Sequence, residues 1–116
     1  MGKPKDTDTG LTPGRFSMLV REAMDRLGIK PLTIIADEPI YDKFSPSLAQ
    51  KAGLDVPTAI IGAAFQAKVP AARLIEVLKL SREDIAKSLD KYLEVLQGVT
   101  DASERDSLVR RYFETG

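Results

Sequence analysis

The chain has 116 residues, of which 43% are hydrophobic, and its 17 basic side chains balance 17 acidic ones. This length predicts one domain with its own core, and the zero net charge disfavours a general nucleic-acid or acidic-membrane binder, because phosphate contacts need a basic excess. The absence of cysteine and histidine excludes disulfides, thiolate metal sites and cysteine nucleophiles, and it removes the commonest general acid–base group.

The first residues form a polar stretch without periodicity. Met1 to about Thr12 contains Pro, Gly, Asp and Thr and no apolar run. We therefore predict a disordered tail over 1–12 and a single helical domain over 13–116. Because the stretch also lacks the apolar run of a secretory signal and the chain lacks cysteine, we expect a cytoplasmic protein.

The next two segments differ in how clearly they predict a structure. Apolar residues from Phe16 to Leu27 recur at the i, i+3, i+4, i+7 spacing of an amphipathic helix, and Gly28 provides its stop. Leu32–Ala36 is short, apolar and β-branched, so it fits either a strand or one helical turn after Pro31. Since no convincing second strand is present, we expect a short helical turn or an irregular buried segment.

From Ser45 onward, helix-capping and helix-breaking residues divide the sequence at regular intervals. Helix starts are indicated at Ser45-Pro46, Asp55 with Pro57, Pro70, Ser81 and Asp101, and helix ends at Gly53 and Gly98. Apolar residues recur at helical spacing between these positions. The predicted fold class is therefore all-α, a compact bundle of five to six short helices.

The segment Val56 to Ala67, VPTAIIGAAFQA, carries no charge in a chain that is 29% charged. It is shorter than the roughly 20 apolar residues that a bilayer-spanning helix needs. We expect a buried core helix, with an exposed partner surface as the alternative. Gly62 costs such a helix about 1 kcal/mol relative to Ala, which predicts a close contact at this position.

The stretch SLAQKAGLDVPTAIIGAAF resembles the helix-turn-helix family at Leu48, Ala49, Gly53 and Leu54. The resemblance implies DNA binding through a second helix that lies in the major groove. Because this register makes the second helix apolar, another register at about residues 60–80, with PAARLIEVLKL as the second helix, fits the chemistry better. Its predicted DNA-binding residues are Lys68, Arg73, Lys79 and Arg82.

Two acidic features near residue 40 suggest metal chemistry. The segment PLTIIADEP resembles the Walker B segment of ABC-type ATPases, which implies that Asp37 holds Mg²⁺ through water and that Glu38 polarises the attacking water. Such a site needs a glycine-rich phosphate loop, which the sequence lacks, and Asp37, Glu38 and Asp42 match no EF-hand spacing. We therefore expect a solvated loop that caps neighbouring helices, and no catalytic residue, metal site or cofactor.

The last predicted helix offers a candidate partner surface. Its apolar stripe comprises Leu108, Val109, Tyr112 and Phe113. Together with Phe65 from the uncharged helix, Leu108, Tyr112 and Phe113 are the predicted partner-binding residues. The sequence thus predicts a non-enzymatic interaction or regulatory module that binds a protein partner or itself, without a membrane. The alternative is a helix-turn-helix-like DNA-binding transcriptional regulator.

Overall fold

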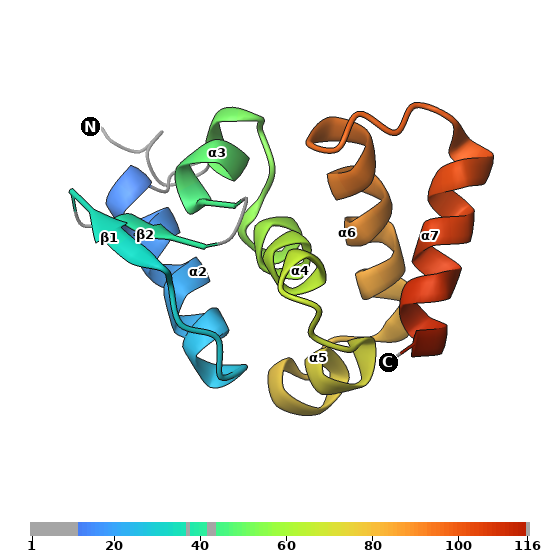
Figure 1. Ribbon diagram of the computed structural model, residues 1–116, viewed down its shortest axis with the longest axis horizontal. Coiled ribbons are helices and arrows are strands. Elements are labelled where there is room, and N and C mark those ends of the chain that lie inside the picture. Colours follow the sequence, from blue (N-terminus) through green and yellow to red (C-terminus); the bar gives the residue numbers. More distant parts are fainter. Residues whose placement is uncertain (1–11, 37, 42–43, 116) are drawn as a thin grey trace, which may run out of the picture.

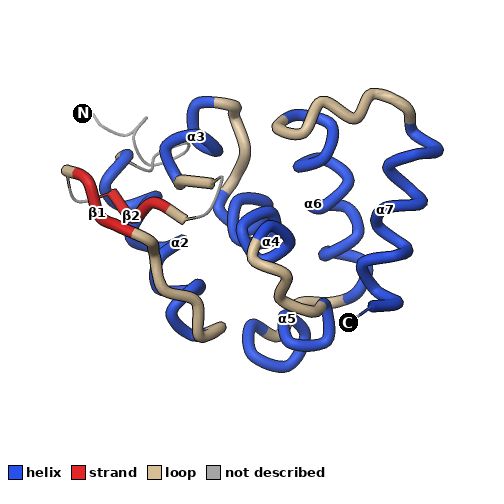
Figure 2. Tube along the Cα trace, viewed as in Figure 1, coloured by secondary structure: helices blue, strands red, loops and turns tan. Residues whose placement is uncertain are grey.

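Six helices and one two-stranded sheet make up the part of the chain that the computed structural model describes, residues 12–36, 38–41 and 44–115 (Figure 1). In chain order they are α2 (Pro13–Arg26), β1 (Thr33–Ile35), β2 (Glu38–Ile40), α3 (Pro46–Lys51), α4 (Val56–Gln66), α5 (Ala71–Leu78), α6 (Arg82–Val95) and α7 (Ala102–Thr115). Figure 2 shows helices through most of the chain and the hairpin at one end. The predicted helical bundle is confirmed, and the hairpin is an addition to it.

The helices begin at capping residues. The side-chain oxygens of Thr12, Ser45, Asp55 and Ser81 each accept a hydrogen bond from the backbone N–H three residues further on. These bonds satisfy donors that the first turn of a helix leaves without an intrahelical partner. Residues 1–11 of the predicted tail lie outside the described residues, whereas Thr12, assigned to that tail from the sequence, is the N-cap of α2.

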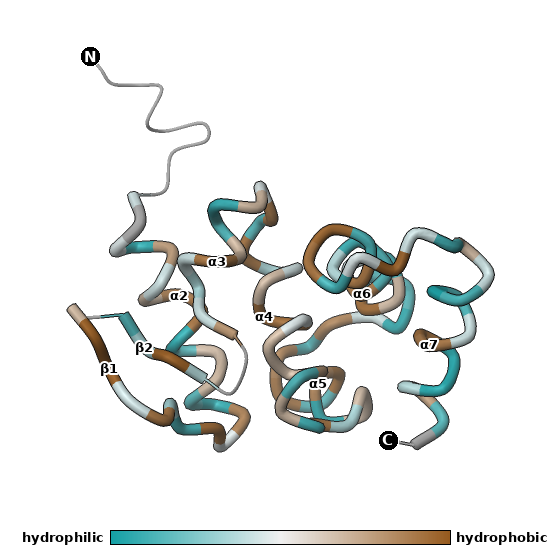
Figure 3. The backbone as a smooth tube through the Cα atoms, turned by 45° about the horizontal axis from the view of Figure 1, so that its top comes forward, coloured by the Kyte–Doolittle hydropathy of each residue, from teal (hydrophilic) through white to brown (hydrophobic). Residues whose placement is uncertain are grey.

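Helix α4 lies at the centre of the molecule, where it packs against α2 on one side and α6 on the other (Figure 1). Most of its residues are buried, namely Thr58, Ala59, Ile61, Gly62, Ala63 and Ala64. Figure 3 shows hydrophilic and hydrophobic segments alternating along α6 and α7, as in amphipathic helices that cover a core. The prediction that the uncharged segment is a core helix is confirmed.

Gly62 allows α4 and α6 to approach closely. A Cβ atom at Gly62 would lie 2.5 Å from Cε1 and 2.8 Å from Cγ of Tyr92 on α6. The Tyr92 ring is buried, and its hydroxyl accepts hydrogen bonds from the side-chain amides of Gln66 at 2.9 Å and Gln97 at 3.3 Å. Because these bonds hold the ring in place, it has little freedom to make room for a methyl group.

We predict that Gly62→Ala lowers the free energy of unfolding by about 1–3 kcal/mol, since overpacking outweighs the gain in helix propensity. Gly14 is the matched control, because it is an exposed helical glycine and an added Cβ meets nothing within 4 Å. Gly14→Ala should raise stability by up to about 1 kcal/mol. Urea unfolding of both variants measures the difference, and a Gly62→Ala protein as stable as wild type would contradict the close contact.

The segment Leu32–Ala36 does not form the helical turn or irregular buried segment that was predicted. Thr33–Ile35 is an antiparallel strand paired with Glu38–Ile40, rather than a helical turn, and its side chains are exposed rather than buried. Ala36 has φ of 51°, in the left-handed region that a tight two-residue connection uses. The partner strand was missed because it has three residues and contains Pro39, and proline within a short run disfavours a strand assignment.

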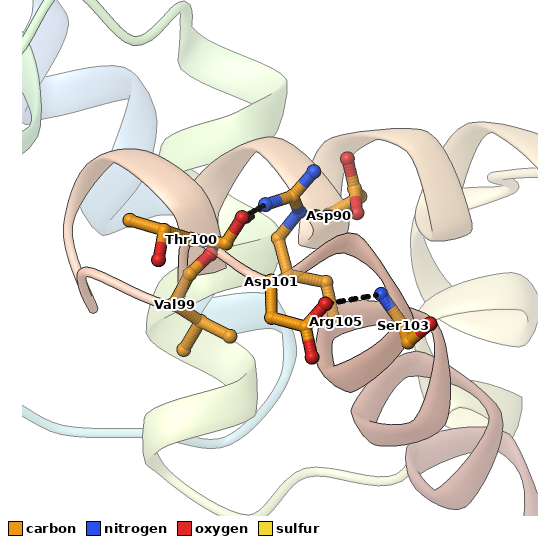
Figure 4. A network of polar contacts seen from close by, with 6 residues as sticks. All are labelled: Asp90, Val99, Thr100, Asp101, Ser103 and Arg105. Atoms are coloured by element: carbon orange, nitrogen blue, oxygen red, sulfur yellow. Dashed lines mark hydrogen bonds and ion pairs between the residues drawn. The ribbon is translucent and has the colours of Figure 1, made fainter.

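Arg105 on α7 forms hydrogen bonds to α6 and to the α6–α7 connection (Figure 4). Its Nε donates to Oδ1 of Asp90 at 2.8 Å, and its Nη1 donates to the carbonyl oxygens of Val99 at 2.9 Å and Thr100 at 3.2 Å. The guanidinium therefore satisfies two carbonyl groups of the α6–α7 connection and one carboxylate of α6. These bonds fix the position of α7, which forms one wall of the groove described below.

Candidate functional site

A groove of about 410 Å³ lies between α7 and the end of α4. One wall comes from the last turn of α4 and the connection to α5, and the other comes from α7. The lining residues are Phe65, Gln66, Lys68, Val69 and Pro70 on the first wall, and Leu108, Arg111 and Tyr112 on the second. Most of these side chains are apolar or aromatic, as is usual for binding grooves.

The aromatic rings of Phe65 and Tyr112 line the groove, and Phe65 also contacts the ring of Tyr92, which is outside the lining. The centroid of Phe65 lies 5.6 Å from that of Tyr112 and 6.3 Å from that of Tyr92, and both pairs are edge-to-face. The Tyr112 hydroxyl donates a hydrogen bond of 2.6 Å to the carbonyl oxygen of Val69. Tyr112 is only 7% exposed, so most of the apolar surface that a ligand can contact comes from the half-buried residues Phe65 and Leu108.

Lys68 stands where the chain leaves α4, in a backbone conformation that favours glycine. Its φ is 66°. Its N–H donates to the carbonyl oxygen of Phe65 at 3.2 Å, and the N–H of Val69 donates to that of Ala64 at 2.9 Å, which is the Schellman pattern. For a residue with a Cβ, this left-handed conformation is about 1 kcal/mol or more less favourable than its ordinary conformation.

The described charged residues that line the groove are both basic. Lys68 and Arg111 are both exposed, one on each wall. No acidic residue is among the described side chains that line the groove. A site with an apolar base and a cationic rim attracts an apolar ligand that carries negative charge.

The structure brings together three of the four predicted partner-binding residues. Phe65, Leu108 and Tyr112 line the groove, whereas Phe113 does not. The Phe113 ring lies beside Tyr112, with centroids 6.1 Å apart, and the guanidinium carbon of Arg82 is 4.4 Å from its centroid. Arg82, a predicted DNA-binding residue, is therefore engaged in a cation–π contact with its own chain.

Arg111 lines the groove, although it was not among the predicted binding residues. It stands three residues after Leu108, and Tyr112 stands four residues after Leu108. Residues at these spacings share one helix face, so the helical period was a signal that could have found Arg111.

The other predicted DNA-binding residues belong to different parts of the chain. Lys68 lines the groove, Arg73 is exposed in the first turn of α5, and Lys79 is exposed at the C-cap of α5. The first helix-turn-helix register fails for a different reason. It requires α4 to lie on the surface as the recognition helix, and α4 is the central buried helix.

The acidic segment near residue 40 contributes a helix cap. Oε2 of Glu38 accepts a hydrogen bond of 2.6 Å from the backbone N–H of Ser47, at the start of α3. This agrees with the expected capping role, but Glu38 belongs to strand β2 and not to the solvated loop that was expected. Asp37 and Asp42 lie outside the described residues. In the described ranges, no three His, Cys, Asp or Glu side chains form a group that could hold a metal ion. No described helix combines the length and apolar character needed to cross a bilayer.

Apolar surface is also found outside the groove. Leu32, just before β1, and Ile35, at the end of β1 next to the hairpin turn, are 73% and 62% exposed, and Ile34 between them is 45% exposed. β1 forms an outer edge of the two-stranded sheet, since its described partner strand is β2 alone. An uncovered apolar edge strand is a surface on which another chain can add a strand.

Comparison with known proteins provides no relative from which to carry over a function. A scan against protein-family models finds no match, and comparisons with curated proteins and with solved structures find none either. The function is therefore argued from the geometry and charge of the groove.

The tyrosines predict alkaline sensitivity. Burial raises the pKa of Tyr41, Tyr92 and Tyr112. Above about pH 10 the unfolded chain releases phenolic protons that the folded chain retains, so the free energy of unfolding should fall as pH rises. We expect Tyr112→Phe to lower the free energy of unfolding by about 1 kcal/mol at neutral pH, because the Val69 carbonyl loses its donor. Above about pH 10, the free energy of unfolding of this variant should decrease less steeply with pH than that of the wild type. Equal slopes for the two proteins in pH-dependent urea unfolding would contradict this role of Tyr112.

Proposed function

We propose that this protein is a non-enzymatic interaction module whose binding site for a protein segment is the groove between α4 and α7. The observation that carries the proposal is the position of Phe65 and Leu108, two half-buried apolar residues from distant parts of the chain that line one open groove. The surrounding aromatic contacts make this groove part of the folded domain. A binding partner therefore meets a preformed site.

The polar groups of the groove favour a protein segment over a small molecule. Small-molecule sites hold a few polar groups that converge on the ligand. Here the Tyr112 hydroxyl bonds to the carbonyl of Val69, and the Gln66 amide bonds to the hydroxyl of Tyr92. Both groups are thus engaged within the chain, while the charges lie at the rim. This distribution resembles a protein interface, with an apolar centre and a polar edge.

The non-enzymatic part of the proposal rests on the chemistry of the residues. Histidine and cysteine are absent from the sequence. Nucleophilic or general acid–base catalysis would then need an activated Ser, Thr, Lys or carboxylate. The groove presents Lys68 as its ionisable amine, and no described carboxylate lines the groove beside it. A binding role accounts for these residues more directly than a reaction does.

A selection from displayed random peptides tests the proposal. We predict that peptides enriched on the wild-type protein bind Leu108→Ser at least about tenfold more weakly, because a central apolar anchor is lost. Val95→Ser is the matched control, since Val95 is 41% exposed on α6 and lies outside the groove lining. Melting curves of both variants establish that they are folded. Equal binding by wild type and Leu108→Ser would place the site elsewhere.

DNA binding is the second candidate function, and two exposed cations, Arg73 on α5 and Lys79 at its C-cap, favour it. We rank it lower, because Glu76 is exposed on the same helix and the formal net charge of the chain is zero. We predict that selection against random duplexes at about 150 mM salt enriches no motif that depends on these cations. An enriched motif that disappears in the Arg73→Ala, Lys79→Ala double variant would reverse the ranking.

A further inference from the structure

We infer that the groove between α4 and α7 is specific for an acidic apolar protein segment, and that Lys68 binds a carboxylate of this segment. This inference rests on the proposed function and names the chemistry of the partner. The apolar part of the segment packs on Phe65 and Leu108, and its acidic side chains lie at the rim, where Lys68 and Arg111 contribute positive charge. The two cations stand on different walls, so one segment lying along the groove passes between them.

The backbone of Lys68 gives the first reason. Its left-handed φ of 66° is the conformation in which glycine is the commonest residue at the end of a helix. A lysine here reduces stability in comparison with residues suited to that conformation. Backbone strain occurs at binding sites but is not confined to them, since Lys79 has the same conformation outside the groove. At this position the side chain supplies a positive charge at the rim of the groove.

The charge distribution gives the second reason. The chain as a whole has equal numbers of acidic and basic residues, yet the described groove lining contains two basic residues and no acidic one. Such a local excess does not follow from composition. It repels a basic segment and attracts an acidic one, and so contributes specificity as well as affinity.

Lys79 provides a matched control within the same protein. It also has a left-handed backbone, with φ of 59°, and it also follows the end of a helix. It is exposed but absent from the groove lining. Replacement of either lysine by glycine removes one positive charge and relieves the same backbone conformation. The two variants therefore differ in whether the lost charge belongs to the groove.

The experiment is a selection of displayed random peptides on the full chain, followed by affinity measurement of the enriched peptides. We expect peptides in which Asp or Glu flanks aromatic or aliphatic residues. Lys68→Gly should weaken their binding about fivefold, the effect of losing one exposed charge pair of about 1 kcal/mol. Lys79→Gly should bind like wild type, because Lys79 is absent from the groove lining. Binding to wild type should also weaken at about 0.5 M salt, because the contacts are exposed charges.

The outcomes separate this inference from the proposed function. Enrichment of neutral apolar peptides, or equal binding of acidic peptides to wild type and Lys68→Gly, would overturn the inference while the groove remained the binding site. Failure to enrich any peptide on wild type relative to Leu108→Ser would overturn both. Displacement of the acidic peptides by a short DNA duplex would overturn the inference in favour of nucleic acid. A doubled mass in light scattering that persists with the peptides present but is lost in Leu108→Ser would overturn it in favour of a second copy. Lys68→Asn, which also tolerates the left-handed conformation, provides a second variant if Lys68→Gly melts early.

Discussion

The contact between the backbone of α4 at Gly62 and the ring of Tyr92 is the constraint on which the rest of the structure depends. Because Gly62 has no side chain, α6 lies close enough for the Tyr92 ring to cover α4. The same ring carries a hydroxyl that accepts bonds from Gln66 and Gln97, and its edge meets Phe65. Phe65 in turn packs against Tyr112, so a chain of aromatic contacts connects this close approach in the core to α7 and the groove.

The candidate site is a consequence of how α4 ends. A helix that is apolar on every side has to be covered on every side, and α2 and α6 cover most of it. At its last turn the chain reverses through Lys68 and leaves Phe65 half-buried. α7 approaches this turn but does not close over it, so apolar surface and the cations of both walls remain at one opening. Binding chemistry is thus placed at the point where the core reaches the surface.

Local signals in the sequence predicted most of the helices, but they did not predict the hairpin and they suggested a helix-turn-helix that is not present at α4. Capping side chains and prolines mark helix boundaries through hydrogen bonds within a few residues, so Ser45, Asp55 and Ser81 could be recognised without a structure. The hairpin could not, because a three-residue strand is too short to display alternation and Pro39 disfavours a strand. The helix-turn-helix resemblance depended on spacing alone, which does not distinguish a central helix from an exposed one.

The sequence by itself determined the all-α class, the helix starts, the core position of the uncharged segment and the need for a close contact at Gly62, since each follows from local hydrogen bonding, periodicity or side-chain size. Only the tertiary structure decided that Tyr92 is the residue in that contact, that Phe65 and Leu108 line one groove, and that Lys68 and Arg111 stand on its two walls. These residues are separated by many positions along the chain. Their juxtaposition depends on the directions in which whole helices pack, which no pattern within a single helix specifies.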